Sequence, residues 1–191
     1  MSIFDKLKTN TPPETETKNI SKDQKGPRRE VFTFNVLPES LIEMMSCPEA
    51  SLDSPFKTAA LTVCALCVYA ADKSIGVEML NWLRGPRPLS PHEISFHDDR
   101  YRDNGHYVPF SYFEGATPDN DYTPNQPFTL VVESTAVSDD VEGYKKLFVK
   151  SGGADSPRSV MLRMRGDGKW FLWEHYLLPG IRVPKSADPW A

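Results

Sequence analysis

Apolar residues in the first half of the folded sequence recur with the spacing of helices. Ser54 and Pro55 give an N-cap followed by proline in the first turn, and from there to Ala71 the chain is apolar nearly all round. We therefore expect a central helix there. Gly85, followed by prolines, ends another helix that begins near Ser74. Together these patterns predict about four helices, at residues 38–46, 54–71, 74–84 and 92–102.

The last of these helices has the most specific start signal. Ser90 and Glu93 have the spacing of a capping box, in which each side chain bonds the backbone N–H of the other residue. Pro91 stands at the first helical position, where a missing N–H costs nothing. The chain is therefore expected to turn into a helix at this serine.

In the second half, apolar residues alternate with the period of two that is typical of strands. From Val160 to Arg165 every second residue is a large apolar one, and "GDG" after it is a tight hairpin signal. The fold class expected is α+β, with a helical N-terminal half packed on a C-terminal four-stranded antiparallel meander. The predicted strands are residues 128–134, 145–151, 159–165 and 169–178.

The last predicted strand has large apolar side chains on both faces. Trp170 and Leu172 alternate with Phe171 and Trp173. This pattern is typical of a central strand that is covered on both sides.

The first thirty residues differ in composition from the rest. Residues 9–30 are almost free of large apolar groups, so ordering them would cost entropy with little burial to offset it. We expect residues 1–30 to be a flexible tail and residues 31–191 to be a single domain. Ile3, Phe4 and Leu7 share one face of a short helical turn, which predicts an amphipathic docking tag.

Charge and cysteine content exclude some classes of function. The 191 residues include 22 Lys and Arg against 26 Asp and Glu, a formal net charge of -4, which disfavours nucleic acid as a partner. Three cysteines and no secretory signal predict reduced thiols in a cytoplasmic protein. The apolar run from Ala59 to Ala71 is shorter than the roughly 20 residues of a membrane span. We expect no membrane contact.

The segment "FHDDRYRDNGHY" is the densest in titratable groups. It contains His97, Asp99 and His106, and an acid/base pair of His97 with Asp99 is the catalytic hypothesis it suggests. The spacing of His92 and His97 does not fit a helical zinc motif, so we expect no metal site. A packed or surface role for these histidines is the favoured interpretation.

Two other motifs also favour structural roles. In "CALC", Cys64 lies well inside a buried helix, whereas a redox cysteine stands near a helix N-terminus. The loop "KSGGADSPR" lacks the spacing of a P-loop and links two predicted strands, so a hairpin loop is favoured. Arg158 at its end stays a candidate for binding an anion.

A long aromatic loop between residues 107 and 128 is a candidate contact surface. Tyr112, Phe113 and Tyr122 lie within it among Gly, Pro, Asn and Asp residues, and ordered loops of this length are usually functional. Trp190, near the end of the chain, is the other candidate contact.

Several loop and core motifs together carry a resemblance to a known family. The chain resembles an uncharacterised bacterial family described only as a domain of unknown function, over about residues 34–191. The resemblance implies a bacterial origin and a compact domain, and it brings no activity, cofactor or catalytic residue. The motifs are "VLPESLIEM", "ALTVCAL", "MLNWLRGPRPLSPHE", "SYFEGATPDNDYTP", "SGGADSPR" and "WFLWEHYLLPGIRVPKSADPWA".

From the sequence we expect a non-enzymatic cytoplasmic binding module with a protein partner and no cofactor, attached through its N-terminal tail. The alternative is a small-molecule-binding protein or enzyme with a pocket between helices and sheet, which would use His97, Asp99 and His106. Attachment to a membrane through the N-terminal tag has little support, because one short apolar tag binds only marginally. The sequence leaves the oligomeric state open.

Overall fold

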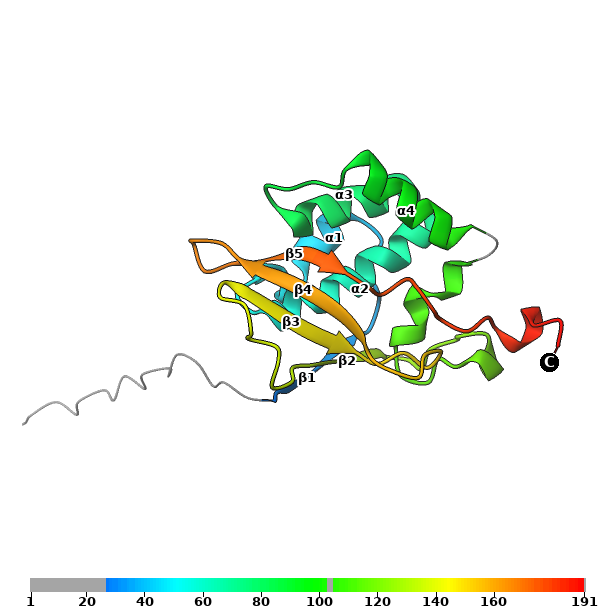
Figure 1. Cartoon of the computed structure of the whole chain (residues 1–191). Coiled ribbons are helices and arrows are strands. Elements are labelled where there is room, and N and C mark those ends of the chain that lie inside the picture. The colour runs from blue at the N-terminus through cyan, green and yellow to red at the C-terminus, as the bar shows by residue number, and fades with distance from the viewer. Residues whose placement is uncertain (1–26, 103–104, 191) are drawn as a thin grey trace, which may run out of the picture.

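The structure is a computed structural model that describes residues 27–102 and 105–190. The predicted docking tag at Ile3, Phe4 and Leu7 lies outside the described residues. Five strands form one antiparallel sheet in which neighbours in sequence are neighbours in space (Figure 1). The strands are β1 (Arg29–Phe34), β2 (Phe128–Glu133), β3 (Tyr144–Val149), β4 (Arg158–Met164) and β5 (Trp170–His175).

Four α-helices of the described chain lie on one side of this sheet (Figure 1). The helix predictions are confirmed with small differences at the ends, and the α+β class is confirmed with them. No described helix is both long and apolar enough to cross a membrane. The helices are α1 (Leu41–Ser46), α2 (Pro55–Ala71), α3 (Lys73–Arg84) and α4 (Pro91–Tyr101).

Helix α2 is the centre of the core, as its composition predicted. Its N-cap Ser54 accepts a hydrogen bond from the backbone N–H of Phe56 at 3.3 Å. The helix is buried along almost its whole length because the sheet covers one side and α3 packs on another. Gly76 allows that packing: a Cβ there would lie 2.3 Å from the Cα of Tyr69, so a larger residue would force the helices apart.

The expected four-stranded sheet was wrong by one strand. The segment "REVFTF" forms β1, which pairs with β2 from Arg29 opposite Glu133 to Phe34 opposite Phe128. The alternation of Phe32 and Phe34 with polar residues was present in the sequence, but it adjoins a polar, proline-containing segment and is short. The helices therefore lie between the first and second strands rather than before the whole sheet.

The two faces of the sheet differ in their covering. The inner face packs on the helices with aliphatic side chains that are all at most 3% exposed, among them Leu130, Leu147 and Leu162. No helix of residues 27–102 and 105–190 lies over the outer face (Figure 1). It carries Tyr144, Arg163 and other aromatic and basic side chains of β3, β4 and β5. Such a one-sided covering is common for antiparallel sheets.

The prediction that the last strand is central was wrong, because β5 is at an edge of the sheet. Other parts of the chain occupy its free backbone groups. The N–H of Trp170 donates to the carbonyl of Leu52 at 2.8 Å, and Thr58 Oγ1 donates to the Trp170 carbonyl at 2.8 Å. The large apolar residues of β5 thus reflect an edge that other segments cover and an outer face on which arginine side chains lie over the aromatic rings.

A β-bulge interrupts β5 at Trp173. Leu172 pairs with Leu162, and Glu174 pairs with Met161, the residue directly before Leu162 in the antiparallel strand β4. Trp173 is therefore the extra residue. Because of this insertion, His175 lies opposite the fully buried Val160 and faces the helices. Strict alternation from the inward-facing Leu172 would have pointed His175 outward.

Candidate functional site

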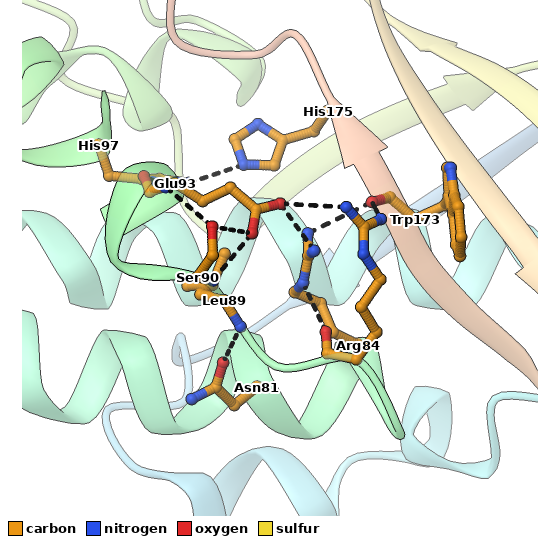
Figure 2. A network of polar contacts seen from close by, with 9 residues as sticks. Asn81, Arg84, Leu89, Ser90, Glu93, His97, Trp173 and His175 are labelled. Atoms are coloured by element: carbon orange, nitrogen blue, oxygen red, sulfur yellow. Dashed lines mark hydrogen bonds and ion pairs between the residues drawn. The ribbon is translucent and has the colours of Figure 1, made fainter. Parts of the chain in front are cut away.

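A buried arginine joins α3, α4 and β5. The Arg84 side chain is 3% exposed and forms an ion pair with Glu93 at 2.8 Å. Its guanidinium also donates to the carbonyl of Arg87 at 2.9 Å and to that of Trp173 at 3.3 Å (Figure 2). A buried charge is stable only when it is paired and hydrogen-bonded, and Arg84 meets both conditions. We call this group the arginine corner.

The predicted capping box supplies the acidic member of the arginine corner. Ser90 Oγ accepts the N–H of Glu93 at 3.3 Å, and Glu93 Oε2 accepts the N–H of Ser90 at 2.8 Å, so the prediction is confirmed. Asn81 Oδ1 accepts the N–H of Leu89 at 2.7 Å and fixes the connection before the helix (Figure 2). The serine bonds and the two neighbouring arginines lower the pKa of Glu93 although partial burial opposes them. Glu93 is therefore held as a carboxylate.

Two histidines meet beside the arginine corner. His97 of α4 and His175 of β5 face each other with their Nε2 atoms 2.9 Å apart (Figure 2). The Nδ1 of His97 lies 2.6 Å from the carbonyl oxygen of Glu93. We call these two residues the histidine pair.

The hydrogen bonds define the tautomers of the neutral histidine pair. A carbonyl only accepts, so His97 carries its proton on Nδ1 and presents a bare Nε2. His175 must then donate from its own Nε2, which leaves its buried Nδ1 as an acceptor without a partner among the described residues. Burial, together with the nearby His97 and Arg84, lowers the pKa of His175 to about 3. Burial also lowers the pKa of His97, so both rings are neutral near pH 7.

On the outer face, aromatic and basic side chains alternate across three strands. The guanidinium of Arg163 lies 5.3 Å from the ring centre of Tyr144 and 4.9 Å from that of Trp173. On the Trp173 ring, Arg87 makes a second contact at 4.4 Å. These four residues form what we call the arginine–aromatic row. Cation–π contacts of this kind attract the guanidinium groups to the rings.

A cleft of about 500 Å³ opens beside this row. It lies between the α3–α4 connection, the β4–β5 hairpin and the outer side of β5 (Figure 1). We call it the hairpin cleft. Its lining residues are Arg84, Pro86, Arg87, Arg163, Met164, Arg165, Gly166, Phe171, Leu172 and Trp173.

Positive charge in the hairpin cleft exceeds the negative charge that reaches it. Arg165 pairs with Asp167 and stacks on Phe171 at 4.5 Å, and Arg87 lies 3.6 Å from a Glu93 oxygen that Arg84 already engages. No carboxylate of the described residues lies within ion-pair distance of Arg163, which is exposed. The cleft therefore offers guanidinium groups to an anion from outside the chain.

The three histidine-segment candidates do not form one site. His97 is 3% exposed and bonds His175, while Asp99 is on the surface in an ion pair with Arg102. His106 is exposed beyond the end of α4. The favoured packed role of His97 agrees with its burial, and the acid/base pairing with Asp99 is not seen because the two side chains leave the helix on different faces.

The aromatic loop candidates are core residues. Tyr112, Phe113 and Tyr122 are each at most 3% exposed. Tyr112 donates to the carbonyl of Leu177, and Tyr122 donates to that of Arg182 at 2.7 Å. The expectation that these three side chains form a contact surface was wrong, because they are buried and two of them bond backbone carbonyls inside the domain.

The two remaining candidates behave differently from each other. Arg158 donates to the carbonyls of Pro179 and Gly180 at 3.2 and 2.8 Å, so it holds the C-terminal segment. Trp190 is 93% exposed.

Cys64 and Cys67 are buried in α2, as expected for core residues, and burial raises the pKa of both thiols. Within the described ranges, no three His, Cys, Asp or Glu residues are grouped to hold a metal.

Sequence reasoning missed the residues that the structure brings together. Arg84, Arg163 and Trp173 lie in the predicted helix end and strands, where the sequence gives them only local roles, and the sequence gives no sign that His175 meets His97. A possible signal was the period-two placement of Tyr144, Lys146 and Phe148 in and just before one predicted strand and of Arg163 and Arg165 on the next. Only the pairing register shows that these positions face each other.

Comparison with known proteins gives one result. No curated protein and no solved structure matches the chain. A protein-family profile for the domain of unknown function DUF6935 matches residues 36–185. The match covers most of the chain, including the arginine corner, the histidine pair and the arginine–aromatic row. The chain therefore belongs to the DUF6935 family.

Proposed function

We propose that this domain is a non-enzymatic binding module whose ligand places an anionic group in the hairpin cleft. The observation that carries the proposal is Arg163, an exposed guanidinium that lies over the rings of Tyr144 and Trp173, with no carboxylate of the described residues within ion-pair distance. The two cation–π contacts restrict the guanidinium before a ligand arrives, so less side-chain entropy is lost on binding.

The chemistry of the lining supports recognition. Arginine stays charged at all physiological pH values and neither gives nor takes protons there, whereas a general acid or base needs a pKa near the working pH. The aromatic and aliphatic remainder of the lining supplies apolar contact. A few polar groups in a mostly apolar cleft are typical of ligand sites.

The arginine corner holds one wall of the hairpin cleft in place. Arg84 and Arg87 both donate to the carbonyl of Trp173, at 3.3 and 3.4 Å. These bonds tie the α3–α4 connection to the bulge of β5 and so set the width of the hairpin cleft. The cytoplasmic location and the docking role of Ile3, Phe4 and Leu7 stay predictions beside this proposal.

An NMR titration of the full chain with citrate tests the proposal. We expect the side-chain N–H signals of Arg163 and Trp173 to shift with increasing citrate, and the shifts to be lost in Arg163→Gln. Arg182→Gln is the matched control, because Arg182 is an exposed arginine that pairs with Asp155, outside the cleft. Citrate shifts that avoid the cleft, or that persist in Arg163→Gln, would contradict the proposal.

A further inference from the structure

We infer that the ligand of the hairpin cleft is a short, extended, acidic segment of a partner protein that lies across strands β3 to β5. This inference rests on the proposed function and specifies its ligand. It is carried by three features of the outer face: the orientation of the guanidinium groups, the length and openness of the row, and the charge around it.

The stacked guanidinium groups favour carboxylates over aromatic rings. Arg163 lies over the rings of Tyr144 and Trp173, so those aromatic faces are already covered by a cation. The planes of these two rings are 82° apart, so the planar guanidinium can lie flat on at most one of them, and N–H donors at its edge stay available. A carboxylate can bind at that edge while the cation–π contacts are kept. A nucleobase would first have to displace the arginine from the ring.

The cationic surface is longer than one small anion. Beyond the row, Lys146 of β3 lies 5.7 Å from the ring centre of Phe148, and Arg165 covers Phe171 at the hairpin. Lys146, like Arg163, is without a carboxylate partner among the residues that the structure describes. None of the described helices covers this face, so a chain could pass over it in extended form (Figure 1). In an extended peptide, alternate side chains point the same way about 7 Å apart and could reach successive cations.

The charge of the whole chain favours a short acidic segment over a long polyanion. The chain has a formal net charge of -4, so a polyanion extending past the basic row would meet a surface of its own sign. A short segment gains the contacts of the row without that repulsion. Exposed ion pairs are individually weak, and binding must therefore come from several carboxylates acting together.

The test compares three probes on the full-length protein by NMR titration at low salt. The first is a blocked ten-residue peptide in which glutamate and serine alternate, and the second is the same peptide with glutamine in place of glutamate. The third is hexathymidylate, whose five phosphates match the five glutamates in charge. We expect the glutamate peptide to shift Arg163 and Trp173, and to bind at least tenfold more tightly than citrate and than the other two probes.

Three variants test the role of the individual residues. Arg163→Gln should weaken glutamate-peptide binding at least fivefold, and Arg163→Lys, which keeps the charge but not the planar stack, should weaken it less. Arg182→Gln should leave it unchanged. The folded state of each variant is checked from its amide spectrum, which should differ from the parent only near the substituted residue.

The outcomes separate this inference from the proposed function. If citrate shifts the cleft and the glutamate peptide binds no more tightly, the extended-segment inference is wrong and the anion site stands. Equal binding of the glutamine peptide would overturn the role of charge. Tighter binding of hexathymidylate would overturn the inference in favour of single-stranded nucleic acid. If neither citrate nor peptide shifts the cleft, both proposals fail.

Discussion

Arg84 and Arg163 are the same residue type and both line the hairpin cleft, but they act in opposite ways. Arg84 is 3% exposed and uses its guanidinium on Glu93 and on two backbone carbonyls. Arg163 is exposed, and within the described residues its guanidinium lies over the rings of Tyr144 and Trp173 and forms no ion pair. The first arginine contributes to stability because its donors are satisfied within the chain. The second is available for a ligand because its donors are not.

The largest effect that would sharpen this comparison is the loss of Arg84. Arg84→Met should lower the free energy of unfolding by about 3 kcal/mol, because it removes the 2.8 Å ion-pair partner of the partly buried Glu93 and one of the two arginine donors to the Trp173 carbonyl. Urea denaturation measures the change. A loss below about 1 kcal/mol would mean that the arginine corner acts like a surface ion pair.

The histidine pair predicts the next largest effect, a pH dependence of stability. The folded pKa of His175 is about 3 and its ordinary pKa is 6.5, so between these values the unfolded chain binds the proton and the folded chain does not. Stability is therefore full above about pH 6.5 and falls as the pH decreases, by about 1.4 kcal/mol per unit for one proton.

Urea midpoints at pH 7.5 and 5.0 measure this effect. We expect a decrease of about 2 kcal/mol in the parent protein. The decrease should be largely absent in His175→Leu and present in His106→Gln, since His106 is exposed. The same decrease in all three proteins would show that other groups cause it.

A smaller effect is expected at the capping box. Ser90→Ala should cost about 1 kcal/mol of stability, because the N–H of Glu93 loses its acceptor and the Glu93 carboxylate loses one donor. Thermal unfolding measures it. If the substitution also weakens citrate binding to the hairpin cleft, the arginine corner positions the cleft as well as stabilising it.

The smallest effect on stability should come from Arg163. Arg163→Met should change the free energy of unfolding by less than about 0.5 kcal/mol, since substitutions of exposed residues rarely do more. Its effect on citrate binding should nevertheless be the largest of the variants named here. A strong destabilisation would show that Arg163, like Arg84, stabilises the fold, and would contradict the different roles given to the two arginines.

Local signals predicted the helices of this fold better than its sheet. The starts of α2 at Ser54 and of α4 at Ser90 depend on residues close together in the chain, and both were predicted. Strand β1 was missed because its six residues find their partners about a hundred positions later, at Phe128–Glu133. No local pattern contains that pairing.

The candidate site was less predictable than the fold for the same reason. The burial of His97 followed from its place on a helix face, whereas its partner His175 lies 78 residues away. Phe171 and Trp173 were interpreted as packing under a second layer. In the structure, arginines from other segments cover them instead. A pattern of apolar residues shows that a surface is covered and does not show what covers it.

The bulge at Trp173 shifts the inward and outward alternation of side chains along β5 by one residue. Before it, alternation directs Phe171 outward and Leu172 inward. After it, the phase has moved by one residue, so that Glu174 lies opposite the outer-face Met161 and His175 opposite the inner-face Val160. If the same residues paired with β4 in regular alternation, without the bulge, the environments of Glu174 and His175 would be exchanged, which would place a carboxylate against the core and remove the histidine pair. The pairing of this strand is therefore as much a determinant of the site as the identity of any residue in it.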